Sequence, residues 1–204
     1  MARGVLRFVA SVLTVSGVLM MSDAGATLLW QEPLSYLLAE RQQGRLEEAF
    51  ANDTEQRKRV VARKPLPGDS IGRIELPTID RRYFMIEGTQ TADLRKGPGH
   101  YEDTPLPGER GTVAVAGHRT TYGAPFRRID DLNRGDPIRV EMPYGSFTYR
   151  VERTRIVDPT EVSVKRAVGY QRLILSACHP LYSAAQRIVV FARLTERDSR
   201  TGVR

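Results

Sequence analysis

From Ile71 onward the chain is a series of short apolar runs separated by glycine, proline and aspartate. In Phe147-Thr148-Tyr149-Arg150-Val151 the apolar residues fall on one face of an extended chain. Short helical turns are expected only at residues 91–95 and 125–132. This pattern predicts about seven or eight strands, and hence a closed all-β barrel or a β-sandwich. The expected strands are IGRIELP from Ile71, RYFMIEGT from Arg82, GTVAVAGH from Gly111, DPIRVEM from Asp136, SFTYRVERTRIVD from Ser146, QRLILSAC from Gln171 and RIVVFARL from Arg187.

The segment before the first strand has a different character. Residues 31–67 are polar and charged, with scattered leucines at loosely helical spacing, which predicts a helical or flexible stalk. Pro65-Leu66-Pro67-Gly68 breaks this pattern and marks a domain boundary. We therefore expect a β-barrel domain over residues 68–195 and a polar tail over residues 196–204.

The first thirty residues contain a long apolar segment. As a helix, residues 8–30 would cover about 34 Å, enough to cross a hydrocarbon core of about 30 Å. Arg3 and Arg7 precede the segment, which predicts a cytoplasmic N-terminus with Trp30 at the far interface. Ala24-Gly25-Ala26 also fits the cleavage site of a signal peptide, but apolar residues resume after it, which favours an uncleaved anchor over residues 1–30. In both interpretations the rest of the chain is exported.

The net charge of the chain is +7, which suits either nucleic acid or an anionic membrane or cell-wall surface. The sequence has no zinc-finger spacing, no RNA-binding aromatic motif and no long basic helix. These absences argue against a nucleic-acid-binding protein.

The chain has a single cysteine, Cys178, at the end of an expected strand. Exported proteins usually pair their cysteines in disulfides, and a lone cysteine cannot pair within its own chain. Cys178 is therefore an intermolecular linker, an inert buried residue or a reactive thiol. A reactive thiol needs a base, because a free thiol has a pKa near 8.5 and is mostly protonated at neutral pH.

Three histidines are candidates for that base. His118 ends an expected strand, so it and Cys178 could meet at one rim of a barrel. His179 would point to the opposite face of the strand from Cys178, and His100 lies in a glycine- and proline-rich stretch. Arg187 opens the strand after Cys178 and suits a developing oxyanion. Each residue also has a purely structural interpretation, and zinc binding by the cysteine and histidines lacks any paired ligand motif.

Two separated motifs resemble those of a known family. GHRTTYGAPF (residues 117–126) and CHPLYSAAQR (residues 178–187) are similar to motifs of the sortases, cysteine transpeptidases of Gram-positive cell surfaces, most of all class E sortases of actinobacteria. GPGHYEDTPLPGERG (residues 97–111) resembles the family's lead-in to the histidine strand, and the similarity covers about residues 68–195. The resemblance implies an eight-stranded sortase barrel with a catalytic triad of His118, Cys178 and Arg187. We expect no cofactor, and the sequence indicates no metal.

The resemblance also implies a reaction. Cys178 would cleave a C-terminal sorting signal between threonine and glycine through a thioester, and an amine of a peptidoglycan precursor or a pilin lysine would resolve it. His118 would protonate the departing amine, and Arg187 would hold the substrate or the oxyanion. The enzyme would be a single-pass membrane protein with an extracellular catalytic domain, and its partners would be secreted proteins that carry the signal. The alternatives are another cysteine acyl hydrolase or transpeptidase, and a membrane-tethered barrel that binds without catalysis.

The sequence departs from the family pattern just before the cysteine. The family usually has T-L-x-T-C, whereas this chain has Ala177 in place of the last threonine. A tyrosine at the position of Tyr122 is linked in class E to a preference for LAXTG over LPXTG signals. We therefore expect Tyr122, Thr121 and Ala177 to contact the substrate.

Overall fold

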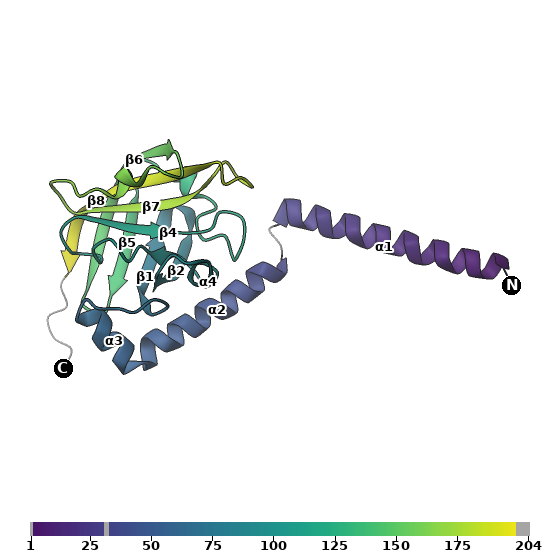
Figure 1. The fold of residues 1–204 in the computed structure, drawn as a ribbon, viewed down its shortest axis with the longest axis horizontal. Helices are drawn as coiled ribbons and strands as arrows, with labels where there is room; N and C mark the ends of the chain where they lie inside the picture. The colour runs from purple at the N-terminus through teal and green to yellow at the C-terminus, as the bar shows by residue number, and fades with distance from the viewer. Residues whose placement is uncertain (1, 31–32, 199–204) are drawn as a thin grey trace.

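The computed structural model describes residues 2–30 and 33–198. Three helices come first, α1 (Ala2–Trp30), α2 (Pro33–Asn52) and α3 (Thr54–Val61), followed by a β-barrel (Figure 1). The barrel contains one short α-helix, α4 (Thr91–Leu94), and three 3-10 turns, η1 (Pro77–Ile79), η2 (Ile129–Asp131) and η3 (Val162–Lys165). Its strands are β1 (Ser70–Leu76), β2 (Arg81–Glu87), β3 (Gly99–His100), β4 (Thr112–Ala116), β5 (Pro137–Met142), β6 (Gly145–Val157), β7 (Arg172–His179) and β8 (Gln186–Asp198).

The eight strands close in the order β1-β2-β3-β4-β7-β8-β6-β5, which confirms the predicted all-β barrel. Pairing is antiparallel except between β2 and β3 and between β4 and β7. The strand expected for each apolar run is present. The two-residue strand β3 was not expected, because two residues are too few to show alternation. The strand β8 continues to Asp198, paired with β6, and so extends three residues into the expected polar tail; residues 199–204 lie outside the described part of the chain.

The central strands β4, β7 and β8 are apolar on both faces. One face fills the barrel interior, where Leu173, Leu175 and Ala177 of β7 pack with their neighbours in the main core. The opposite face carries a second, smaller cluster on the outside of the barrel: Ala114, Val157, Ile174, Val189 and Phe191. Burial of each large aliphatic side chain contributes about 1.5–3 kcal/mol to folding. The outer cluster forms a packed apolar surface on the outside of the barrel, beside the ends of these strands.

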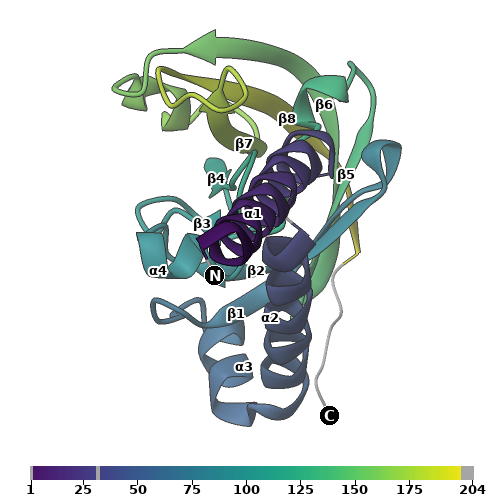
Figure 2. The same cartoon turned by 90° about the vertical axis from the view of Figure 1, so that its right-hand side faces the viewer.

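The expected stalk is helical and packs against the barrel. Figure 2 shows α2 alongside β2 and β1, with α3 turning back at its end. The side chain of Gln43 accepts a hydrogen bond from Phe84 N at 2.6 Å and donates one to Lys96 O at 2.9 Å. Leu46 and Phe50 pack on Phe84 and Ile86 beside these bonds. At Phe84, β2 pairs with β1 along one edge, and α2 covers its other edge.

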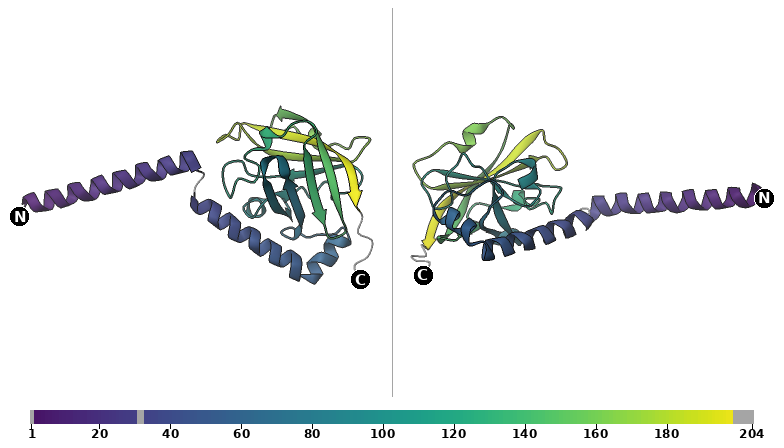
Figure 3. Two further views of the ribbon diagram at one scale, coloured as in Figure 1. Left: turned by 180° about the vertical axis from the view of Figure 1, so that it is seen from behind. Right: turned by 60° about the horizontal axis from the view of Figure 1, so that its bottom comes forward.

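The helix α1 extends away from the barrel (Figures 1 and 3). Within the described residues it is the one helix long and apolar enough to cross a membrane, over Arg3–Gly25 with a mean hydropathy of 1.8 and none of that window buried. The predicted interfacial position of Trp30 concerns a side chain outside the described part of the structure.

Candidate active site

The strand pairing brings His118 next to Cys178. The parallel register of β4 and β7 sets Ala116 opposite Ser176, and Gly117 N donates a hydrogen bond to Ser176 O at 3.0 Å. If this register is continued by two residues, His118, just after β4, comes opposite Cys178, near the end of β7. Side chains two residues apart share a face, so both point to the outer face of the sheet, the face of Ala114 and Ile174.

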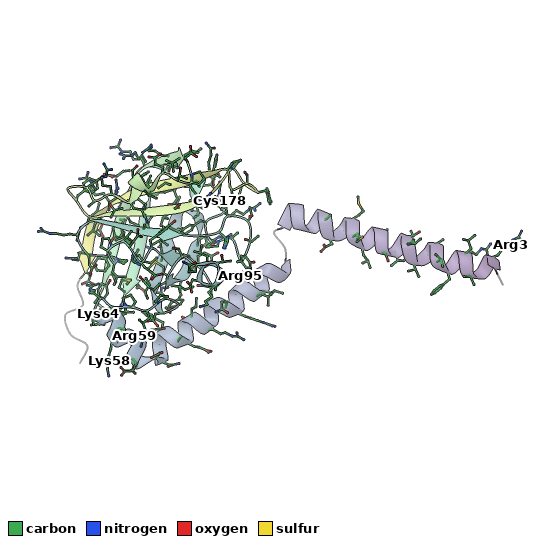
Figure 4. All side chains as sticks on the ribbon, in the orientation of Figure 1. Arg3, Lys58, Arg59, Lys64, Arg95 and Cys178 are labelled. Carbon is green, nitrogen blue, oxygen red and sulfur yellow. The ribbon has the colours of Figure 1, made fainter. Side chains whose placement is uncertain are left out.

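The antiparallel pairing of β7 with β8 places Arg187 directly opposite Cys178. Opposed residues in such a pair project from the same face with Cα atoms about 4.5–5.5 Å apart. The Arg187 guanidinium donates from Nη1 to the carbonyls of Ala184 and Gln186, at 2.9 Å each. Figure 4 shows Cys178 on the side of the barrel from which α1 extends. Residues far apart in sequence thus lie on three adjacent strand ends, on the outer face of the barrel.

The His118 ring is half-buried and packs on the ring of Tyr122, with the two centroids 5.0 Å apart. Its Nε2 atom is buried without a hydrogen-bond partner among the described residues. Burial lowers the pKa of His118, and the positive charge of Arg95 lowers it further. Both effects favour the neutral imidazole, the form that can accept a proton.

A groove of about 150 Å³ continues from this site along the outer face of β7 and β8. Arg187 and Ser176 lie at its end nearest Cys178. The rest of its lining is mostly apolar and comes from β6, η3, β7, β8 and the segment after β3: Tyr101, Val157, Val162, Val164, Ile174 and Val189. A groove of this composition suits an extended peptide with an apolar side chain.

Comparison with known proteins agrees with this geometry. The model of the sortase domain family matches residues 74–195. The chain belongs to the sortase family. Sortases are cysteine transpeptidases, and this chain has a single cysteine, Cys178.

Sortase D of Bacillus subtilis is 36% identical over 146 residues, which cover 70% of this chain and 72% of that protein. Sortase SrtE1 of Streptomyces coelicolor is 28% identical over 211 residues, 96% of this chain but only 58% of that protein. Its solved structure, which has a tripeptide in the active site, superposes with a TM-score of 0.60 at 28% identity over 64% of this chain and 91% of that chain. The structure of sortase E from Streptomyces avermitilis gives a TM-score of 0.61 at 32% identity over 66% of this chain and 93% of that chain.

The loop of this sortase that follows His118, residues 118–126, is held from two sides. Tyr83 donates a hydrogen bond from its hydroxyl to Gly123 O at 3.3 Å. Gly123 has φ +74, and a Cβ placed on it would lie 2.7 Å from the Cβ of Ala39 in α2. Only glycine allows both this backbone conformation and this close approach. The helix α2 therefore supports the loop that carries the histidine.

The predicted substrate-contact residues have different positions. Tyr122 is 37% exposed and contacts His118, and Thr121 lies partly buried in the same loop, where its carbonyl accepts from Ala124 N at 2.9 Å. The side chain of Ala177 is 3% exposed and packs inside the barrel, away from the groove, so its expected contact with substrate stays a prediction for its backbone alone. Adjacent strand residues point to opposite faces, so an outward Cys178 requires an inward Ala177.

The other two histidines have structural partners. His100 is buried, and its ring nitrogens lie 2.9 Å from a Glu87 carboxylate oxygen and 3.0 Å from Pro105 O. The Nδ1 atom of His179 lies 3.3 Å from Nη1 of Arg119. Within the described part of the chain, no group of three or more His, Cys, Asp or Glu residues could hold a metal ion.

Sequence reasoning missed Arg119. Its side chain is almost fully buried, yet it carries a charge and makes contacts in both the histidine loop and the cysteine strand. The only signal in the sequence is its position next to His118, because its contacts with the cysteine strand join residues about sixty positions apart.

Proposed function

We propose that this protein is a membrane-anchored sortase that cleaves a C-terminal sorting signal between threonine and glycine and transfers the protein to an amine. The family supplies the reaction class, and the single observation that carries the assignment of residues is the register of β4, β7 and β8. That register supports Cys178 as the nucleophile, His118 as its proton acceptor and Arg187 as the group that binds the substrate oxygen.

In the first half of the reaction, the Cys178 sulfur attacks the threonine carbonyl carbon and its proton passes to the His118 imidazole. The lowered pKa of His118 supports this role, because the neutral ring has a free lone pair. When the tetrahedral intermediate collapses, the bond to the glycine nitrogen breaks, and His118 returns the proton to that departing amine. The product is a thioester on Cys178.

In the second half, an amine attacks the thioester and loses a proton to His118. The amide bond forms, and the thiolate leaves and recovers the proton. The acceptor would be an amine of a peptidoglycan precursor or a pilin lysine. Transfer rather than hydrolysis requires that the amine compete with water at the thioester.

Arg187 would stabilise the negative charge on the carbonyl oxygen of the intermediate. Its two hydrogen bonds to backbone carbonyls both use Nη1, so the remaining guanidinium nitrogens can donate to a substrate oxygen. Loss of one such donor from an active site typically costs about 2.7–4 kcal/mol of transition-state stabilisation.

The apolar groove would hold the first residue of the sorting signal, a leucine in both LPXTG and LAXTG. Tyr122 lies at the other side of the site, against His118, where it could contact the second residue. We propose that Tyr122 favours LAXTG-like signals.

The helix α1 would anchor the enzyme in the cell membrane as a single span, with the N-terminus in the cytoplasm and the barrel outside. Its length, its hydropathy and its extension away from the barrel support this arrangement. Arg3 and Arg7, at the N-terminal end of the span, agree with a cytoplasmic N-terminus. Its substrates would be secreted proteins that bear the signal, and the anchor would keep the enzyme where they leave the membrane.

The test uses the full chain in detergent, incubated with LPXTG and LAXTG peptides and followed by intact-mass spectrometry. We expect a covalent acyl adduct on the wild type and none on Cys178→Ala. Added diglycine or another small amine should convert the adduct to an aminolysis product. Hydrolysis alone would indicate a cysteine hydrolase, and no adduct with either peptide would overturn the proposal.

A further inference from the structure

We infer that Arg119 is a positioning residue that holds His118 and Cys178 in register, an inference that rests on the proposed roles of these two residues. Arg119 directly follows His118, and because side chains alternate along an extended chain it points away from the histidine. Its side chain is 2% exposed. A guanidinium keeps its charge in proteins, so its burial needs a specific set of acceptors.

One set of acceptors lies directly after the histidine loop. Nε and Nη2 of Arg119 both donate to Arg127 O, at 3.3 Å each. Nη2 also pairs with a carboxylate oxygen of Asp130 at 2.7 Å. These bonds tie the start of the loop to its end and fix the turn that carries His118.

The other set lies at the end of β7. Nη1 of Arg119 is 3.5 Å from Cys178 O and 3.3 Å from Nδ1 of His179. A guanidinium can only donate, so Nδ1 of His179 accepts. One side chain thus contacts the backbone of the nucleophile and the residue after it.

This contact falls where the backbone ladder ends. Among the described residues, the last backbone hydrogen bond that joins the β4 segment to β7 is the one from Gly117 N to Ser176 O. Beyond that point, Arg119 supplies the connection between the two segments. A planar guanidinium with five donors can bind both sets at once, whereas the ammonium of lysine is a single point with three donors.

Loss of this connection would change the distance between the Cys178 sulfur and the His118 ring. Proton transfer needs these atoms within hydrogen-bond reach, and a misplacement of about 1 Å can reduce a rate by about 100-fold. Arg119 does not line the apolar groove, so substrate binding should change little.

The experiment compares full-length wild type with Arg119→Lys and Arg119→Met in detergent. The matched control is Arg128→Met, which removes an exposed arginine just after the same loop that pairs with Asp131 at 2.7 Å. Three measurements are made: the kinetics of peptide cleavage, which give kcat and KM, the thermal midpoint, and the rate of Cys178 alkylation by iodoacetamide as a function of pH.

We expect kcat to fall about 10- to 100-fold in both Arg119 variants, with KM within about threefold of wild type. The pH profile of alkylation should shift toward that of His118→Ala, because the thiol loses its neighbouring base. Arg128→Met should match wild type in all three measurements. Alkylation does not depend on turnover, so it tests Arg119 even if no sorting peptide is cleaved.

Two results would overturn the inference. One is a kcat for Arg119→Lys within twofold of wild type. The other is a loss of activity that only follows the loss of folded protein while the alkylation profile of the folded fraction stays as in wild type, since that would show a purely structural role.

Discussion

Substitution of Gly123 by alanine tests whether α2 supports the histidine loop. The new residue would have to adopt φ +74, which costs an L-amino acid about 1–2 kcal/mol. Its Cβ would also lie 2.7 Å from the Cβ of Ala39, an overlap that should cost about 1–3 kcal/mol more. We therefore expect Gly123→Ala to lower the free energy of unfolding by about 2–5 kcal/mol.

The two contributions can be separated by a double-mutant cycle. Ala39→Gly removes the atom that the new Cβ would meet, so in that background Gly123→Ala should cost only the backbone term of about 1–2 kcal/mol. The difference between the two backgrounds measures the contact between α2 and the loop. It does not include the intrinsic cost of glycine within a helix, because that cost cancels in the cycle.

The assay is thermal or denaturant unfolding of the full chain in detergent, followed by circular dichroism. At this size, 1 kcal/mol corresponds to a shift in the midpoint of about 2–4 °C. The peptide-cleavage rate should fall in Gly123→Ala and recover in part in the double variant. If Gly123→Ala has the same cost in both backgrounds, to within about 0.5 kcal/mol, the helix does not lie against this loop and the reasoning is refuted.

Three further predictions concern single side chains. Arg95→Gln removes a positive charge that disfavours the imidazolium, so the pKa of His118 should rise and its NMR titration should move to higher pH. Gln43→Leu leaves Phe84 N without its acceptor and should lower the free energy of unfolding by about 1–3 kcal/mol, with faster amide exchange at Phe84. Wild type should cleave an LAXTG peptide about tenfold faster than an LPXTG peptide, and Tyr122→Phe should reduce this ratio.

Each of these predictions has a control or a contrary outcome. Lys96→Gln removes a neighbouring charge that pairs with Asp93, and it should leave the His118 titration unchanged. An unchanged His118 titration in Arg95→Gln would show that burial alone lowers the pKa. Full stability of Gln43→Leu would mean that water replaces the Gln43 amide, and equal wild-type rates on the two peptides would remove the proposed role of Tyr122.

The barrel could be predicted because the sequence pattern of each strand lies within the strand and the turns beside it. Alternating polarity and the glycine, proline and aspartate breaks lie within each run of residues, so the strands were correct to within a few positions. The two-residue strand β3 gave no such signal. The packing of α2 on β2 also depends on a contact, Gln43 with Phe84, that joins residues 41 positions apart.

The candidate site was predictable in part for the same reason. His118, Cys178 and Arg187 stand at the ends of apolar runs, and strand ends can be located in a sequence. Ala177 was expected to contact the substrate because it neighbours the nucleophile, but its side chain faces the barrel interior. The alternation argument that set His179 on the opposite face from Cys178 applies equally to Ala177. Arg119 was missed because a buried arginine and a solvated one look alike in sequence.

The packing of α2 on the histidine loop sets a limit on where this enzyme can act. The alanine that touches Gly123 is at position 39, only nine positions after the end of α1 at position 30. That length spans about 14 Å as a helix and about 30 Å at full extension. With α1 in the bilayer, as we propose, the histidine loop at Gly123 lies within this short distance of the lipid surface, so we expect both the incoming polypeptide and the acceptor to be delivered close to the membrane rather than deep in the wall.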